Sequence, residues 1–167
     1  MLEEFVYVGK IVNTHGIKGE VRILSDFEYK DKVFKPKMVI YIGRKKEQEV
    51  INTYRHHKNF EMITMEGYGN INEILKYKGL YVYVKKEDLN LSSEEILDDE
   101  LMNLKVLVAG KERGYIKDIR KNSGSQKILE IDDNGKTILI PYHPEFINEV
   151  NVKEKYIVIL PIKGLFE

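Results

Sequence analysis

The stretch His15-Gly16-Ile17-Lys18-Gly19-Glu20-Val21-Arg22 decides the fold of the first part of this chain. Two glycines three residues apart stand between two strand-like segments, residues 5–14 and 20–25. In the second segment Val21 and Ile23 share one face, which is the two-residue period of a strand. Glycine has no Cβ, so it adopts positive φ and lets another backbone come close. The stretch therefore predicts an exposed hairpin turn, which suits binding better than buried catalysis.

Basic side chains surround this turn. Lys10, His15, Lys18 and Arg22 are four potential phosphate ligands within thirteen residues, which favours an anionic partner such as nucleic acid. The alternative is a hairpin whose glycines serve only the turn geometry and whose charges are solvated. Both interpretations stay open on these residues alone.

Composition indicates a globular protein rather than a disordered or membrane-spanning one. Of the 167 residues, 43% are hydrophobic and 32% are charged, which is typical of one domain or of two small ones. No apolar run approaches the roughly 18 residues that cross a bilayer. The start Met1-Leu2-Glu3-Glu4 is acidic where a signal peptide is basic. We therefore expect a cytoplasmic protein that does not contact a membrane.

Cysteine content and charge narrow the function classes further. The chain contains no cysteine, which excludes disulfides, thiolate zinc sites and thiol nucleophiles. The formal net charge is zero, but residues 1–88 carry 16 Lys and Arg against 13 Asp and Glu, and residues 89–167 carry 11 against 14. This asymmetry fits a first part that meets nucleic acid and a second that meets a basic protein. Random scatter of surface charge explains it equally well.

Short strand-like segments with tight turns dominate the first half and predict a small barrel or sandwich. A helix interrupts them: Asn70 can cap it, Glu73 follows as in a capping box, and Gly79 ends it. A weaker helical turn is expected within residues 26–34. The expected strands are residues 5–14, 20–25, 37–43, 48–57, 59–66 and 80–84.

A polar, charged segment without strand periodicity, residues 89–97, predicts a linker. After it, a second all-β unit of roughly 70 residues is expected, a size that usually carries only marginal stability of its own. Its strands are expected at residues 104–109, 113–121, 126–132, 136–141, 147–152 and 155–160, with turns at Ala109-Gly110, Ser123-Gly124, Asp133-Asn134-Gly135 and Lys153-Glu154.

The sequence offers no pattern that supports catalysis or a metal site. His56 and His57 are adjacent on a predicted strand, so their side chains point to opposite faces and cannot both ligate one ion without a bulge. The stretch Ser123-Gly124-Ser125 lacks the preceding glycine of a nucleophile elbow, and Gly67-Tyr68-Gly69 lacks the third glycine of a dinucleotide-binding loop. The carboxylates of residues 94–100 lie in or beside the linker, where solvated charge is the ordinary explanation. We expect no catalytic residue, no metal and no cofactor.

Three basic groups lie at or near turns of the first half: Lys18 with Arg22, the tip Arg44-Lys45-Lys46, and Arg55-His56-His57-Lys58. Loops at one end of a small barrel can form a single surface, so these groups could be neighbours. Histidine and arginine stack on unpaired bases, as in the recognition of RNA loops and bulges. The alternative is that lysine-rich tips only protect edge strands.

Several stretches, in order along the chain, resemble the motifs of a single family. Val8 to Ile23 resembles its N-terminal signature, and Ile71 to Leu80, ending in Lys78-Gly79-Leu80-Tyr81-Val82, resembles its helix-to-strand segment. In the second half the similar stretches are Lys136 to Pro141, Glu145-Phe146-Ile147 with Val150-Asn151, and the ending Ile159 to Leu165 with its Leu-Pro and Gly-Leu pairs. The chain is identified on these motifs as a member of the ribosome maturation factor RimM family.

The resemblance implies a non-catalytic accessory factor that binds the immature small (30S) ribosomal subunit and helps the head of the 16S rRNA to mature. It implies a mainly β fold: a translation-factor-like barrel over residues 1–88, a linker over 89–97 and a PRC-barrel domain over 98–167, with one or two short helices. The expected partners are the small-subunit precursor, 16S rRNA and a ribosomal protein of the 30S head. We expect a monomer.

Two sets of residues are the candidate binding sites. For RNA they are His15, Gly16, Lys18, Gly19, Arg22, Arg55, His56, His57 and Lys58; for the ribosomal protein they are Ile96, Leu97, Pro141 and Tyr142. Family members often carry an aromatic pair at the position of Ile96-Leu97, and here the apolar part is kept while the hydroxyls are lost. Packing between the two domains is the alternative role for this pair.

Two other function classes are weighed against this one. An RNA-processing or nucleotide-modifying enzyme would need a catalytic group, and the sequence shows none. The other is a structural adaptor without RNA contact, which the salt dependence of binding would distinguish.

Overall fold

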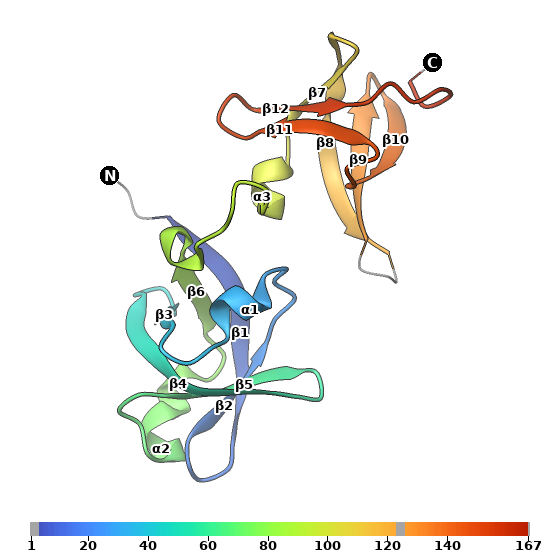
Figure 1. Ribbon diagram of the computed structural model, residues 1–167. Helices are drawn as coiled ribbons and strands as arrows, with labels where there is room; N and C mark the ends of the chain where they lie inside the picture. Colours follow the sequence, from blue (N-terminus) through green and yellow to red (C-terminus); the bar gives the residue numbers. More distant parts are fainter. Residues whose placement is uncertain (1–3, 123–125, 167) are drawn as a thin grey trace. The chain divides into compact units, whose positions relative to one another are not determined.

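The computed structural model describes residues 4–122 and 126–166 (Figure 1). The fold is mainly β, with two six-stranded sheets and a few short helices, which confirms the predicted fold class. The chain divides into two compact units, Met1–Ser92 and Ser93–Glu167. The predicted turn at Ser123-Gly124 and the Ser123-Gly124-Ser125 stretch lie outside the described residues. Among the residues that are described, no helix has the length and apolar character to cross a membrane.

The first unit is a closed barrel of six antiparallel strands. Its hydrogen-bonded order is β1-β2-β5-β4-β3-β6, and β6 closes the barrel by pairing with β1. Closure leaves none of these strands with an unpaired edge. The strands are β1 (Phe5–His15), β2 (Glu20–Leu24), β3 (Val39–Ile42), β4 (Glu47–His57), β5 (Phe60–Met65) and β6 (Tyr81–Lys85).

Alternation of side chains along the strands fills the barrel. In β6, Val82 and Val84 are fully buried in the core, whereas Tyr81 lies on the outer face and is 49% exposed. The same two-residue period places Ile40 and Ile42 of β3 inside. The inward side chains form one hydrophobic cluster, so the interior is a packed core and not a channel.

Short helices connect the barrel strands, and the predicted helix cap is present. The side chain of Asn70 accepts a hydrogen bond from the backbone N–H of Asn72 at 2.9 Å, and Glu73 accepts from the Gly69 N–H at 3.2 Å. The helix ends ahead of Gly79, whose φ is +86°. The elements are α1 (Lys30–Val33), α2 (Ile71–Ile74) and the 3-10 turn η1 (Leu75–Tyr77).

The second unit is a six-stranded sheet in the order β10-β9-β8-β7-β12-β11. The β12–β7 pair is parallel and the other pairs are antiparallel. Ile138 and Ile140 at one end of the sheet and Ile147 and Val150 at the other pack on the same core, so the sheet curls around it as a barrel does. The strands are β7 (Lys105–Val108), β8 (Lys111–Lys121), β9 (Lys127–Asp133), β10 (Lys136–Pro141), β11 (Ile147–Asn151) and β12 (Tyr156–Ile159).

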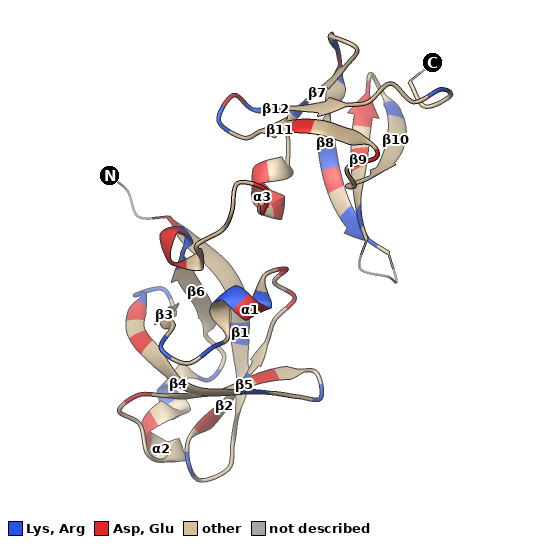
Figure 2. Cartoon of the chain, in the orientation of Figure 1, with Lys and Arg blue, Asp and Glu red and all other residues tan. Residues whose placement is uncertain are grey.

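The segment around residues 85–101 has more structure than its composition predicts. A 3-10 turn, η2 (Lys86–Leu89), buries Leu89 in the core of the barrel. A short helix, α3 (Asp98–Leu101), begins with an acidic turn that is red in Figure 2. The Glu100 carboxylate accepts a hydrogen bond from the Leu97 N–H at 3.1 Å, so this carboxylate caps a helix. The prediction of solvated charge at this position is therefore incomplete.

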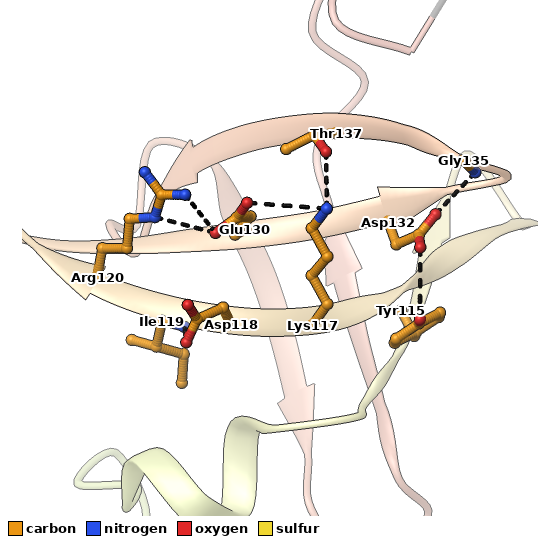
Figure 3. Close-up of polar contacts among 9 residues, drawn as sticks. All are labelled: Tyr115, Lys117, Asp118, Ile119, Arg120, Glu130, Asp132, Gly135 and Thr137. Carbon is orange, nitrogen blue, oxygen red and sulfur yellow. Dashed lines mark hydrogen bonds and ion pairs between the residues drawn. The ribbon is translucent and has the colours of Figure 1, made fainter.

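The outer face of the second sheet carries a network of paired charges (Figure 3). Glu130, only 8% exposed, accepts a hydrogen bond from Arg120 Nε at 2.9 Å. Lys117 Nζ lies 3.8 Å from the same carboxylate and donates to the Thr137 hydroxyl at 2.7 Å. Both basic and acidic residues occur along β8 and β9 (Figure 2). Because Glu130 has cationic partners in both Arg120 and Lys117, we do not assign a binding role to this face.

Candidate functional site

The strand order of the barrel brings two of the three predicted basic groups together. Strand β2 pairs with β5, and β5 pairs with β4, so Arg22 and Arg55 both stand opposite Met62. Met62 is fully buried although it is not part of the barrel core, and it lies between these two basic residues in the sheet. We call the outer surface formed by His15, Arg22, Arg55 and His57 the cationic face.

The route by which these groups meet differs from the expected one. In the β2–β5 ladder Val21 pairs with Ile63 and Ile23 pairs with Glu61. The glycine turn before β2 and the β4–β5 hairpin tip therefore lie toward opposite ends of this ladder. The groups meet across the sheet through long side chains, and not through loops at one end of the barrel. The third group, at Arg44-Lys45-Lys46, stands at the β3–β4 turn, away from this ladder.

Arg22 is the most constrained residue of the cationic face. Its Nη2 lies 2.8 Å from His15 Nδ1, and its guanidinium lies 5.7 Å from the centroid of the Phe60 ring. A guanidinium can only donate, so Nδ1 of His15 accepts this bond and the ring proton is on Nε2. The Nε of Arg22 is buried without a hydrogen-bond partner in the part of the chain that the structure describes. Arg22 thus holds the face together as well as contributing charge.

Arg55 is held by Glu20, a residue that the sequence did not single out. The guanidinium donates to both carboxylate oxygens, at 2.8 and 2.7 Å. The hydrogen bond from Arg55 is the main reason that the pKa of Glu20 is lowered. A bidentate pair of this kind fixes the side-chain geometry. The positive charge of Arg55 is therefore partly neutralised by Glu20. The excess positive charge of the cationic face comes from other residues.

The two adjacent histidines point to different neighbours, as a strand requires. The His57 ring centroid lies 6.5 Å from that of His15 on the cationic face. Its pKa is lowered, first by burial and then by the charges around it, including Arg55 and Lys58. His56 instead places its Nδ1 3.0 Å from the buried carboxylate of Glu61. His57 therefore lies in a positive field, whereas His56 belongs to a separate polar pair.

The two glycines of the turn have different roles. A Cβ on Gly19 would lie 3.1 Å from the backbone oxygen of Asn70, so this glycine lets the turn pack against the start of α2. The Ile71 N–H also donates to the Ile17 carbonyl at 3.1 Å. Gly16 has a φ of +72° and open space around it. At Gly19 the predicted close approach is therefore to the chain's own backbone. Of these two glycines, only Gly16 leaves room for a partner.

Two lysines beside the cationic face are available for an anion. Lys18 and Lys58 are exposed, and neither forms an ion pair within residues 4–122 and 126–166. Lys58 stands at the β4–β5 hairpin tip with a φ of +55°. These side chains are free to rearrange onto phosphate groups, because nothing in the described fold depends on them.

A groove in the second unit contains part of the predicted protein-binding set. It has a volume of about 480 Å³. Ile96 and Tyr142 line it, whereas Leu97 and Pro141 do not. Ile96 is 8% exposed and belongs to the core of this unit, so it forms the floor of the groove. The remaining lining residues are Ser93, Glu94, His143, Pro144, Ile147, Asn148, Glu149 and Val150.

The sequence missed residues that complete both surfaces. Glu20 and Phe60 position the arginines of the cationic face. Strand pairing places Glu20 opposite His15 and Phe60 opposite His57, and only this pairing reveals their role. Glu94 and Glu149 give the groove acidic side chains, and nothing in the local pattern relates them. Within the described residues, no group of three or more His, Asp or Glu side chains could hold a metal ion.

Comparison with known proteins matches both units. Residues 6–89 match the model of the RimM N-terminal domain, and residues 98–165 match the RimM PRC barrel domain. A solved structure of a 16S ribosomal RNA processing protein RimM from Pseudomonas aeruginosa is 19% identical, with a TM-score of 0.44 over 95% of this chain and 98% of that one.

Curated relatives are similar over their whole length. Ribosome maturation factor RimM of an Exiguobacterium species is 38% identical over 98% of both chains. The protein of the same name from Halalkalibacterium halodurans is 34% identical over 99% of this chain and all of its own. Because the two family models and these relatives cover nearly every residue, the chain belongs to the RimM family of ribosome maturation factors.

Proposed function

We propose that this protein is a non-catalytic accessory factor in the maturation of the small ribosomal subunit. In this proposal the barrel binds 16S rRNA and the second unit binds a basic ribosomal protein of the 30S head. The family's name, ribosome maturation factor, supports the ribosomal role. The distribution of charge and apolar surface over the two units supports the assignment of a different partner to each unit.

One observation carries the RNA-binding part: basic residues that are more than thirty positions apart in the chain converge on one face of the barrel. Arg22 and Arg55 are pre-positioned by His15 and Glu20, so ordering them costs little entropy when a ligand binds. Lys18 and Lys58 extend the positive charge as mobile phosphate ligands. The guanidinium planes of the arginines and the imidazole rings of the histidines also offer surfaces on which unpaired bases can stack.

The groove of the second unit suits a basic protein segment. Its floor is apolar at Ile96, Ile147 and Val150, and its walls carry the carboxylates of Glu94 and Glu149. An apolar floor with charged groups around it is the arrangement of a protein interface with a polar rim. Ribosomal proteins that bind rRNA are basic, so the acidic wall is complementary to them.

The mechanism in this proposal is binding without covalent change. A ligand shifts a conformational equilibrium only by its differential affinity for the two states. A factor that binds rRNA with one unit and a ribosomal protein with the other favours the arrangement in which both are within reach. The second contact then takes place at high effective concentration.

The RNA-binding part is tested with Lys18→Glu/Lys58→Glu. Arg22 is avoided because it is bonded to His15 and packs on Phe60, so its loss would disturb the fold. Binding to 30S precursor particles is measured over a salt titration. Each lost phosphate contact makes the slope of log K against log salt concentration shallower by about 0.7–0.9. The slope of the double variant should therefore be shallower by roughly twice that amount, while its melting temperature stays unchanged.

The matched control is Lys111→Glu/Lys153→Glu, which makes the same charge change at exposed positions of the second unit. We expect its salt slope to equal that of the wild type. Equal slopes for all three proteins would show that the two lysines beside the cationic face do not contact RNA phosphates, and would favour an adaptor that does not touch RNA.

The groove is tested with Glu94→Lys in the full chain, against purified basic proteins of the 30S head. A charge at the rim of an interface acts mainly on the association rate, so slower association is expected. Glu154→Lys, an exposed change at the β11–β12 turn, is the control. Identical rates for both variants would remove the groove from the proposal.

The enzyme alternative is tested by incubating the pure protein with precursor 16S rRNA and divalent metal ions. The proposal expects the RNA to stay unchanged in length and mass. Cleavage or modification by the protein alone would establish catalysis.

A further inference from the structure

The outer surface of the barrel carries a second conspicuous feature, on strands that the cationic face uses little. Five aromatic side chains project from β1, β3 and β6, and we call them the aromatic face. Strand register places Tyr7 opposite Tyr83 and Tyr83 opposite Tyr41, so three rings form a row across the strands. The members of the aromatic face are Phe5, Tyr7, Tyr41, Tyr81 and Tyr83.

The rings pack edge to face and still leave two of them open. Tyr7 lies 5.5 Å from Tyr81 and 6.0 Å from Tyr83 between ring centroids, and Phe5 lies 5.1 Å from Tyr41. Tyr7 and Tyr81 are each 49% exposed. Mutual packing holds the rings in fixed orientations. The face is therefore a preformed platform that presents aromatic surface to a partner.

Lysines stand among the rings. The Nζ of Lys46 lies 4.1 Å from the Tyr83 ring centroid, that of Lys10 lies 5.6 Å from Tyr81, and that of Lys85 lies 5.3 Å from Tyr41. Lys10 and Lys46 form no ion pair within the part of the chain that the structure describes. Cations over ring faces in this way are attracted by the ring quadrupoles.

The lysines also connect the aromatic face to the basic group at the β3–β4 turn. Lys46 belongs to the Arg44-Lys45-Lys46 tip, and its φ of +53° is part of the turn that carries the tip. Arg44 and Lys45 are exposed beside it. The carboxylate of Asp26 acts on Tyr7: after burial, it is the next cause of the raised pKa of this tyrosine. Positive charge therefore prevails around the rings.

This combination identifies the chemistry of the partner. The core of a protein interface is depleted in lysine, whereas lysines here stand between the rings. Aromatic rings on a sheet surface with interleaved cations are the arrangement that binds single-stranded nucleic acid: bases stack on the rings, and lysines meet the phosphates. Duplex RNA does not fit this arrangement, because its bases are already stacked on each other.

We propose that the aromatic face binds single-stranded RNA, with unpaired bases stacked on Tyr7 and Tyr81 and the backbone phosphates on Lys10 and Lys46. This inference deepens the proposed function, because it takes RNA as the partner, but it assigns a surface separate from the cationic face. Strand β1 contributes residues to both surfaces.

The test uses the absence of tryptophan from the chain. Tyr81→Trp introduces a single tryptophan on the aromatic face, whose fluorescence is excited apart from that of the tyrosines, and stacking of a base quenches it. The probes are a short oligouridylate and a blunt RNA hairpin of the same number of nucleotides. We expect saturable quenching by the oligouridylate and little by the hairpin.

Paired substitutions separate stacking from charge. Tyr7→Leu/Tyr81→Leu should weaken oligouridylate binding about 10-fold for each ring without changing the salt slope. Tyr7→Phe/Tyr81→Phe keeps both rings, and neither hydroxyl has a hydrogen-bond partner within residues 4–122 and 126–166, so this variant should bind like the wild type. Lys10→Glu/Lys46→Glu should weaken binding and make the salt slope shallower.

Three results would overturn the inference. The leucine variant binds the oligouridylate as tightly as the phenylalanine variant does, or the wild type binds the hairpin and the oligouridylate equally well. In the third, the leucine variant still binds RNA but no longer binds a ribosomal protein. If any of these occurs while Lys18→Glu/Lys58→Glu still weakens binding to 30S precursors, the aromatic face is wrong and the proposed function stands. If the wild type binds neither RNA nor precursor, both fail.

Discussion

Gly114 in strand β8 is the position where a single added carbon should damage the second unit most. It lies in a bulge of the β7–β8 ladder, between the pairs Lys105–Tyr115 and Leu107–Glu112, with a φ of +83°. A Cβ at this position would overlap the backbone carbonyl oxygen of Asp132 and lie 2.7 Å from its carbonyl carbon. The obstacle is backbone on the neighbouring strand, so no side chain can move away to make room.

The expected loss for Gly114→Ala follows from two contributions. A left-handed backbone costs a residue with a Cβ about 1–2 kcal/mol. The overlap forces β8 and β9 apart at the Tyr115–Asp132 pair, and each backbone hydrogen bond lost there costs about 1 kcal/mol. With one or two bonds lost, the free energy of unfolding of this unit should fall by about 2–4 kcal/mol.

Gly135→Ala is the matched control. Gly135 is in the β9–β10 turn of the same unit and has a φ of +92°, but nothing lies within 4 Å of a Cβ there. This variant has only the backbone contribution, about 1–2 kcal/mol. The gain from a stiffer unfolded chain is the same for both substitutions, so the difference of about 1–2 kcal/mol isolates the overlap with Asp132.

Hydrogen exchange followed by mass spectrometry on peptides of β9 and β10 measures the opening free energy of this unit separately from the barrel. Peptides from β4 and β5 serve as an internal reference and should not change. Equal losses for Gly114→Ala and Gly135→Ala would show that backbone conformation alone sets the cost, and the steric reasoning would be refuted.

Other predictions concern a cap, a charge pair and alkaline pH. Asn70→Ala removes the cap of α2 and should lower the free energy of unfolding of the barrel by about 1 kcal/mol in urea titrations, with Asn70→Asp retaining most of it. Glu130→Gln should cost about 1 kcal/mol, because Arg120 is 59% exposed and solvent compensates its charge, and high salt should shrink the difference from the wild type. Burial, and then the hydrogen bond to Glu61, raises the pKa of Tyr54 to about 12. The stability that the protonated hydroxyl contributes is therefore fully present below the ordinary tyrosine pKa of about 10, and it is lost as the pH rises through the pKa of the folded state. Urea titrations should show stability falling by up to about 1.4 kcal/mol per pH unit in that window, less steeply in Tyr54→Phe.

Local chemistry explains why most elements follow from the sequence. The Asn70 cap and the Asn134-Gly135 turn depend on neighbours within four residues, so their residues predict them directly. The strands follow from the alternation of apolar and polar side chains. The charged segment after residue 85 was the exception, because composition does not reveal that Leu89 is buried or that Glu100 caps a helix.

The candidate surfaces could be predicted only in part. The basic residues of the cationic face are visible as clusters, but their supports Glu20 and Phe60 become meaningful only when β2 pairs with β5 and β5 with β4. The aromatic face left a readable signal: Tyr81 and Tyr83 alternate with Val82 and Val84. That pattern predicts rings on the outside of a strand, yet it does not say that the rings of three strands form one row.

The sequence by itself determined the family, the all-β class and the residue types that carry charge, because these depend on motifs and on contacts between near neighbours. The tertiary structure decided which of those residues act together. Arg22 and Arg55 are 33 positions apart in the chain, and they flank Met62 because strand pairing places β2 and β4 on either side of β5, each at a spacing of about 5 Å. Register, and not composition, separates the cationic face from the aromatic face on one barrel.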